Sequence, residues 1–272
     1  YTLHRMDGEG GAIRTLSYHE TNEWHPWVLN DGRLVYTRWD YVDRSAAHFH
    51  GLWTTTPEGT LAASVFGNYT MDVNACYQPR SVPGSEKILF VVGAHHANVG
   101  GALALLDPSQ AALDPETGRD LLDRLEVLTP EVCFPEAPGW PDTYYHSPWP
   151  LSEDQYLVSW SRDPLPGMGP GIDADTKTAL YYFDRFGNME LIQRAEEISC
   201  MYPIPLVPRP APPILPSQGS AEDVREDSGE FFLADVRQSL LPLPEDRPIV
   251  ALRIFQLLPK GEDHVVNSPR IG

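Results

Sequence analysis

The sequence has few cysteines, no cluster of basic residues and no long apolar run, and each absence excludes a class of protein. Cys76, Cys133 and Cys200 stand far apart, which excludes paired-cysteine zinc sites and the C-x-x-C-H attachment of c-type haem within the chain. No apolar run approaches the ~20 residues of a membrane-spanning helix. With 38 acidic against 20 basic residues and a net charge of −18, the chain repels phosphate backbones, so nucleic acid is excluded as a partner.

Long helices are also missing from the pattern. The 272 residues include 27 prolines, about twice the usual ~5%. Windows that are free of proline and have a helical period are confined to Asp120–Leu128 and Ser239–Leu243. The other periodic segments are short β-branched and aromatic runs between Gly, Pro and Asp turns, which predicts an all-β fold.

A diverged repeat is present, and each copy opens with a residue followed by proline. These steps are His25-Pro26, Gln78-Pro79, Ser147-Pro148 and Tyr202-Pro203. After a turn, β runs follow at 34–39, 87–92 and 156–160, and further hairpins are predicted within 52–66, 101–128 and 179–192. Four strands per repeat predict a partial β-propeller of antiparallel blades, about three complete blades plus part-blades.

The repeat also predicts the domain organisation. Residues 1–204 form the blades, opening with a hairpin over 1–17 from a preceding blade, and a closed ring needs at least about four blades. We therefore expect further N-terminal blades or closure by a partner. Residues 205–228 are rich in Pro, Ser and acidic residues and predict an extended or disordered linker. Residues 229–272 contain two predicted strands, 230–236 and 249–258, at the start of a second β domain.

Histidines collect on one predicted rim of the blades. Loops alternate between two rims in a four-stranded blade, and this rule places His25, His95, His96 and His146 on the same rim, with the 48–50 loop. With the carboxylates Glu20, Glu23, Asp40 and Asp72, these four histidines are the candidate ligands of a divalent metal. The alternative is that they cap strand ends and pack against tryptophans. The opposite rim carries plain turn residues, such as Asn30-Asp31-Gly32.

Two longer sequence segments resemble those of a known family. The segments are His19-Glu20-Thr21-Asn22-Glu23-Trp24-His25-Pro26 and Trp140-Pro141-Asp142-Thr143-Tyr144-Tyr145-His146-Ser147-Pro148, with 31–41, 101–107 and 251–254 in support. With them the sequence resembles the hydrazine synthase α-subunit family. The resemblance implies an N-terminal six-bladed propeller, then a haem-binding middle domain and a second haem domain. Because no C-x-x-C-H occurs here, no c-type haem and no catalytic residue are carried over.

Two functions remain open from the sequence. The first is a non-catalytic propeller module of an exported, periplasmic protein, which scaffolds a downstream domain or docks subunits of the same complex. The second is a metal-dependent hydrolase or oxidase that uses the histidine-rich rim. The absence of a specific catalytic motif favours the module.

Overall fold

A computed structural model describes residues 1–18, 22–40, 45, 47–110, 112–136, 139–167, 177–216, 233, 235–237, 243–244 and 246–254. Its contacts divide the chain into a first unit containing Tyr1–Leu215 and a second containing Pro216–Ser268. The described residues are all-β apart from one 3₁₀ turn, η1, at Leu122–Arg124. No helix among them is long and apolar enough to cross a membrane.

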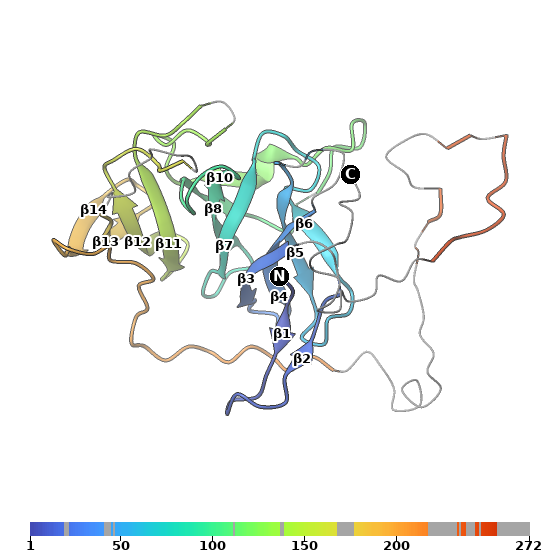
Figure 1. The fold of residues 1–272 in the computed structure, drawn as a ribbon, viewed down its shortest axis with the longest axis horizontal. Coiled ribbons are helices and arrows are strands. Elements are labelled where there is room, and N and C mark those ends of the chain that lie inside the picture. Colours follow the sequence, from blue (N-terminus) through green and yellow to red (C-terminus); the bar gives the residue numbers. More distant parts are fainter. Residues whose placement is uncertain are drawn as a thin grey trace, which may run out of the picture. The chain divides into compact units, whose positions relative to one another are not determined.

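The first unit contains three four-stranded antiparallel meanders in chain order (Figure 1). The first meander is β3 (Asn22–Val28), β4 (Leu34–Trp39), β5 (His50–Thr55) and β6 (Ala63–Phe66). The second is β7 (Ala75–Ser81), β8 (Ile88–Gly93), β9 (Ala102–Leu106) and β10 (Leu125–Val127). The third is β11 (Tyr144–Pro150), β12 (Gln155–Ser161), β13 (Ala179–Asp184) and β14 (Met189–Gln193). A separate hairpin, β1 (His4–Arg5) with β2 (Arg14–Thr15), precedes them, as the sequence predicts.

The X-Pro steps produce the same β-bulge in the first strand of every meander. The pairing of β3, β7 and β11 shifts by one residue at His25-Pro26, Gln78-Pro79 and Ser147-Pro148. The residue before each proline has a positive φ of 51°, 51° and 49°, and Tyr202 before Pro203 has 55°. A positive φ is uncommon in residues other than glycine. A bulge bends the strand that contains it. The predicted equivalence of the four steps is therefore confirmed in backbone conformation.

Neighbouring meanders meet through equivalent contacts. Each contact joins the start of a third strand to the start of the next repeat's first strand. The contacts are the parallel bridge His50–Ala75, the bridge Gly101–Tyr145, and the bond from the Cys200 N–H to the Thr178 carbonyl at 2.9 Å. The first contact joins two meanders into one eight-stranded sheet. The described residues contain no closed ring of sheets, so the structure establishes an all-β fold of antiparallel sheets and no finer class.

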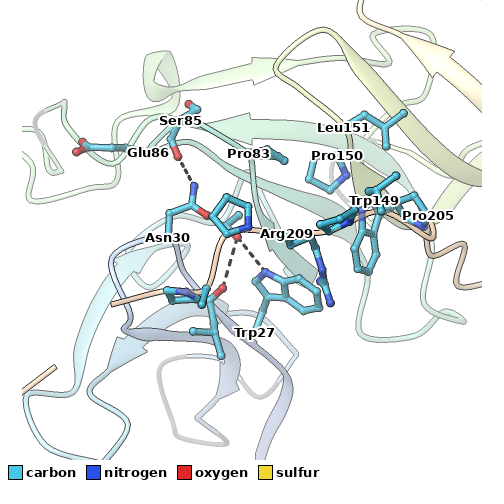
Figure 2. Close-up of a pocket in the computed structure, with 18 residues that line it drawn as sticks. Trp27, Asn30, Pro83, Ser85, Glu86, Trp149, Pro150, Leu151, Pro205 and Arg209 are labelled. Carbon is cyan, nitrogen blue, oxygen red and sulfur yellow. Dashed lines mark hydrogen bonds between the residues drawn. The ribbon is translucent and has the colours of Figure 1, made fainter. Parts of the chain in front are cut away.

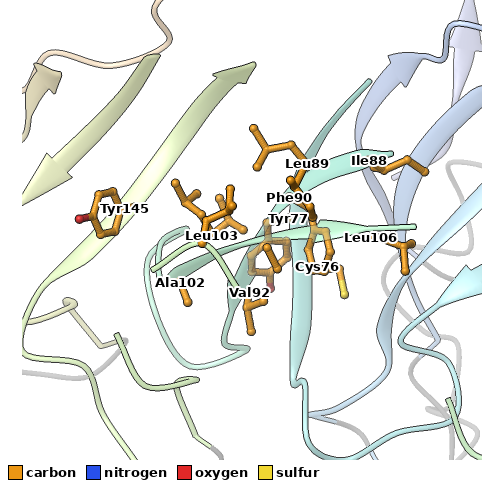
Figure 3. Close-up of a cluster of buried hydrophobic side chains, with 14 of the residues drawn as sticks. Cys76, Tyr77, Ile88, Leu89, Phe90, Val92, Ala102, Leu103, Leu106 and Tyr145 are labelled. Carbon is orange, nitrogen blue, oxygen red and sulfur yellow. The ribbon is translucent and has the colours of Figure 1, made fainter. Parts of the chain in front are cut away.

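The core lies on the strands of the second meander. Every residue of β8 and β9 is buried, because these strands are covered on both faces and read as continuous apolar runs. Their side chains, with Cys76 and Tyr77 of β7 and Tyr145 of β11, form one buried cluster (Figure 3). The three cysteines are free thiols.

The proline-rich segment packs on the meanders although it has no regular secondary structure. We call residues 205–215 the strap; Figure 1 draws it as an orange extended trace. The Arg209 guanidinium lies over the rings of Trp27 and Trp149. Further along, the Pro213 carbonyl occupies the position that a Cβ on Gly32 would take. The predicted linker therefore covers part of the first unit over residues 205–215.

Several expectations are not met in the described residues. The helical window Asp120–Leu128 forms only the short η1 turn and then β10, because Leu125–Val127 pairs with β9. Ile249–Ile254 lies in no strand. Most of the predicted strand 230–236 and of the helical window 239–243, together with 255–258, lies outside the described residues. The second β domain stays a prediction.

Candidate functional site

His50, at the start of β5, is the centre of the cluster on the histidine-rich rim. Its Nε2 lies 3.2 Å from Nδ1 of His95, and its Nδ1 lies 3.2 Å from the Tyr77 hydroxyl. The His50 ring also stacks on Trp39 at 4.9 Å and on Trp24 at 5.7 Å between ring centroids. Loops of the first and second meanders thus meet here, as the alternation of loops between rims predicts.

The four predicted ligands divide into a close pair and two separate residues. The rings of His95 and His96 lie 4.6 Å apart, and Nδ1 of His96 is 2.5 Å from a Glu136 carboxylate oxygen. His25 lies edge-on to Tyr77 at 5.7 Å. His146 is buried in β11, with Nδ1 2.8 Å from the Ser147 hydroxyl. The rim brings two of the four together and leaves His25 and His146 in their own strands.

Burial keeps the imidazoles of His50, His25 and His146 neutral. Loss of solvation, strengthened by the neighbouring His95, lowers the pKa of His50 to about 3. Burial also lowers the pKa of His25 to about 4, with a further contribution from Arg80, and that of His146 to about 4. The pKa of His95 is lowered for the same reason. A neutral imidazole can bind a metal, so protonation does not prevent ligation at neutral pH.

Geometry gives no support to a metal site in the described part of the chain. No three His, Cys, Asp or Glu side chains there come close enough to hold one ion. The candidate carboxylates are engaged elsewhere: Glu23 accepts from the Leu3 N–H, Asp40 pairs with Arg38, and Asp72 accepts from Thr70. His19 and Glu20 lie outside the described residues. The divalent-metal site at His25, His95, His96 and His146 stays a prediction.

A cavity lies on the opposite rim, where the sequence predicts only turns. We call this rim the turn face; its pocket has a volume of about 1070 Å³ (Figure 2). Its walls come from the end of β3 and the turn at Asn30, the β7–β8 turn at residues 83–86, the end of β11 with Leu151, and the strap. Asn30 fixes two of these walls relative to each other, because its amide donates to the carbonyls of Val82 and Ser85 at 2.7 and 2.8 Å.

Two tryptophans and an arginine form the aromatic end of this pocket. Trp27 and Trp149 meet edge to face at 5.3 Å between ring centroids. Arg209 of the strap lies 5.0 Å from the Trp149 ring and 5.8 Å from the Trp27 ring. Figure 2 shows Arg209 between the two rings. This group was not predicted from the sequence, although both tryptophans directly follow the proline of an X-Pro step.

Comparison with known proteins gives a weak structural relationship. No family model matches the sequence, and no curated protein matches it. Among solved structures, hydrazine synthase of Kuenenia stuttgartiensis matches at 16% identity with a TM-score of 0.44, over 68% of this chain. The match spans about a fifth, 21%, of the length of that hydrazine synthase chain. A likeness of this size assigns neither a family nor an activity.

Proposed function

We propose that the first unit is a non-catalytic propeller-type module that docks a protein domain or subunit. The propeller assignment is supported by the repeated four-stranded meander, by the shared X-Pro bulge and by the equivalent contacts between meanders. The non-catalytic role is supported by the histidine-rich rim. Its central imidazole, His50, is buried and engaged with Tyr77, Trp39 and His95 rather than with a carboxylate.

The observation that carries the docking role is an exposed apolar edge on the third meander. Four of the five residues of β14 are exposed, whereas the residues of β10, the corresponding strand of the second meander, are all half-buried. Further exposed apolar side chains follow β14 in the chain, as far as Leu206 at the start of the strap. The apolar edge consists of Leu191, Ile192, Ile198, Tyr202, Ile204 and Leu206.

An edge of this kind suits a partner that is itself β-structured and apolar. β14 is the last strand of its sheet, so one side of its backbone is available for pairing. Exposed large apolar side chains along such an edge favour a partner that covers them. Leu191 is 50% exposed and Ile204 is 62% exposed, so both can contact a partner without rearrangement. A partner that adds a strand to β14 would bury both features together.

Site-specific crosslinking tests this proposal in the full-length protein. A photoreactive phenylalanine analogue at Leu191 or Ile204 should crosslink to the same single polypeptide in cells of the source organism. The same analogue at Met6, which is 65% exposed in the β1–β2 hairpin, should give no such product. Equal crosslinking from Met6, or none from both edge positions, would contradict the docking role. Ile204→Glu should abolish the Leu191 product if the partner is specific.

The metal-dependent alternative is tested separately by metal analysis of the same protein. A stoichiometric transition metal that is lost in both His95→Ala and His96→Ala would favour the enzyme.

A further inference from the structure

The cations of the turn face fall into a paired group and an unpaired group. Three are neutralised by neighbouring carboxylates. These pairs are Arg33 with Asp31 at 2.7 Å, Lys87 with Glu153 at 2.7 Å, and Arg185 with Asp154 at 3.1 Å. Arg80 and Arg209 are different, because neither forms an ion pair with any carboxylate of the described residues.

These two arginines stack on the tryptophans of the pocket instead. The Arg80 guanidinium lies 4.3 Å from the Trp27 ring centroid, and Arg209 lies over Trp149. Arg80 donates from Nη1 to the Pro79 carbonyl, while its buried Nε has no hydrogen-bond partner. Arg209 is exposed and makes no hydrogen bond to the described residues. A guanidinium has five N–H donors in a planar fork that matches a carboxylate. Stacking occupies the face of Arg209 and leaves this donor edge available.

The net charge of the chain limits the size of the anion that can enter the pocket. The chain carries a net charge of −18, and its field extends about 8 Å at physiological ionic strength. A polyanion would be repelled over its whole length, whereas a small ligand with one negative group is attracted by the local arginines. Glu86 at the pocket wall adds a further negative charge that a second anionic group would meet.

The shape of the pocket indicates what the uncharged part of the ligand is. Trp27 and Trp149 meet edge to face at one end of the pocket, where Trp149 is buried and the half-buried Trp27 presents the more accessible ring. Aromatic rings prefer to pack on such a ring in stacked or edge-on arrangements. The pocket volume of about 1070 Å³ is at the upper end for small-ligand sites, which are apolar with a few fixed polar groups. We infer that the turn-face pocket binds a small aromatic carboxylate, with the rings against Trp27 and the carboxylate on Arg209.

This site is separate from the apolar edge, because Arg209, Trp27 and Trp149 are not part of that surface. Failure of the docking proposal would therefore leave the ligand-binding proposal intact, and failure of the ligand-binding proposal would leave the docking proposal intact.

The test uses a matched pair of two-ring probes, 2-naphthoate and its neutral amide 2-naphthamide, with isothermal titration calorimetry on the full chain. We expect naphthoate to bind about fivefold more tightly than naphthamide at low salt, a typical effect of one charge-assisted contact. Arg209→Gln should make the two affinities equal and leave the naphthamide affinity unchanged. Arg33→Gln, an exposed arginine of the same face that already has a carboxylate partner, should change neither.

Trp27→Phe should weaken the binding of both probes, since it reduces the aromatic wall rather than the charge; far-ultraviolet circular dichroism checks that the variant is folded. Equal affinity of the two probes for the unmodified chain would overturn the inference. So would a preference for naphthoate that survives Arg209→Gln.

Discussion

At the scale of single residues, the histidines show what a loop-alternation rule can and cannot predict. Chain topology correctly brings His95 near the 48–50 loop, and the observed contact joins His95 to His50. The rule says nothing of side-chain direction, which depends on local bulges and on packing. His146 therefore turns to its neighbour Ser147, and the metal site could not be decided from positions alone.

The buried histidines make stability depend on pH. The pKa is about 3 for His50 and about 4 for His25 and His146 in the folded chain, against 6.5 when exposed. The unfolded state therefore binds more protons, so the free energy of unfolding is highest above pH 6.5 and decreases as pH falls towards 4. Each histidine should contribute on the order of 1 kcal/mol per pH unit in that window.

Urea unfolding at pH 7.5, 6.5 and 5.5 measures this slope. His50→Phe should reduce it by one histidine's share, while His4→Gln, at an exposed position, should leave it unchanged. A slope that is the same in all three proteins would show that the pKa of His50 is not lowered in the folded chain.

At the scale of elements, the strands were predictable because their signals are local. The turn at Asn30–Gly32 and the runs on either side of it define β3 and β4, and the same holds for the other hairpins. The bulge is also encoded locally, since a proline restricts the residue before it and removes a backbone donor. What could not be predicted is the set of contacts that the bulges make with each other. Those contacts join residues separated by a whole repeat.

Gln78 is the clearest of these contacts. Its side chain is buried, its Oε1 accepts from the Ser147 N–H at 2.6 Å, and its Nε2 donates to the Tyr202 hydroxyl at 3.3 Å. Gln78→Met keeps the volume and leaves the buried Ser147 N–H unpaired, so the free energy of unfolding should fall by roughly 2 kcal/mol. Tyr202→Phe removes only the longer bond to an exposed residue and should cost well under about 1 kcal/mol. Urea denaturation compares the two; equal losses would mean that the Ser147 bond does not stabilise the fold.

At the scale of the whole first unit, composition predicted the strap's conformation and missed its role. A proline-rich run is expected to be extended and without regular secondary structure, and residues 205–216 agree. The packing of that run depends on partners far away in sequence, Trp27 and Gly32 among them. The pocket was missed for the same reason, because its walls meet only when turns of all three meanders and the strap are in place.

Two glycines in equivalent turns allow the strap's packing to be measured. Gly32 in the β3–β4 turn and Gly187 in the β13–β14 turn have φ of +89° and +88°. A Cβ on Gly187 would meet no atom within 4 Å, whereas one on Gly32 would overlap the Pro213 carbonyl.

Gly187→Ala should therefore cost about 1 kcal/mol, the strain of a left-handed alanine. Gly32→Ala carries the same strain and must also displace the strap, so its cost in urea unfolding should be about twice as large. Replacing residues 210–215 by a Gly-Ser sequence should make the two substitutions equal, because the coupling to the strap is then removed. Equal losses of unfolding free energy for Gly32→Ala and Gly187→Ala in the unmodified chain would mean that the strap makes no close contact with the β3–β4 turn. The strap would then not form the pocket wall that carries Arg209.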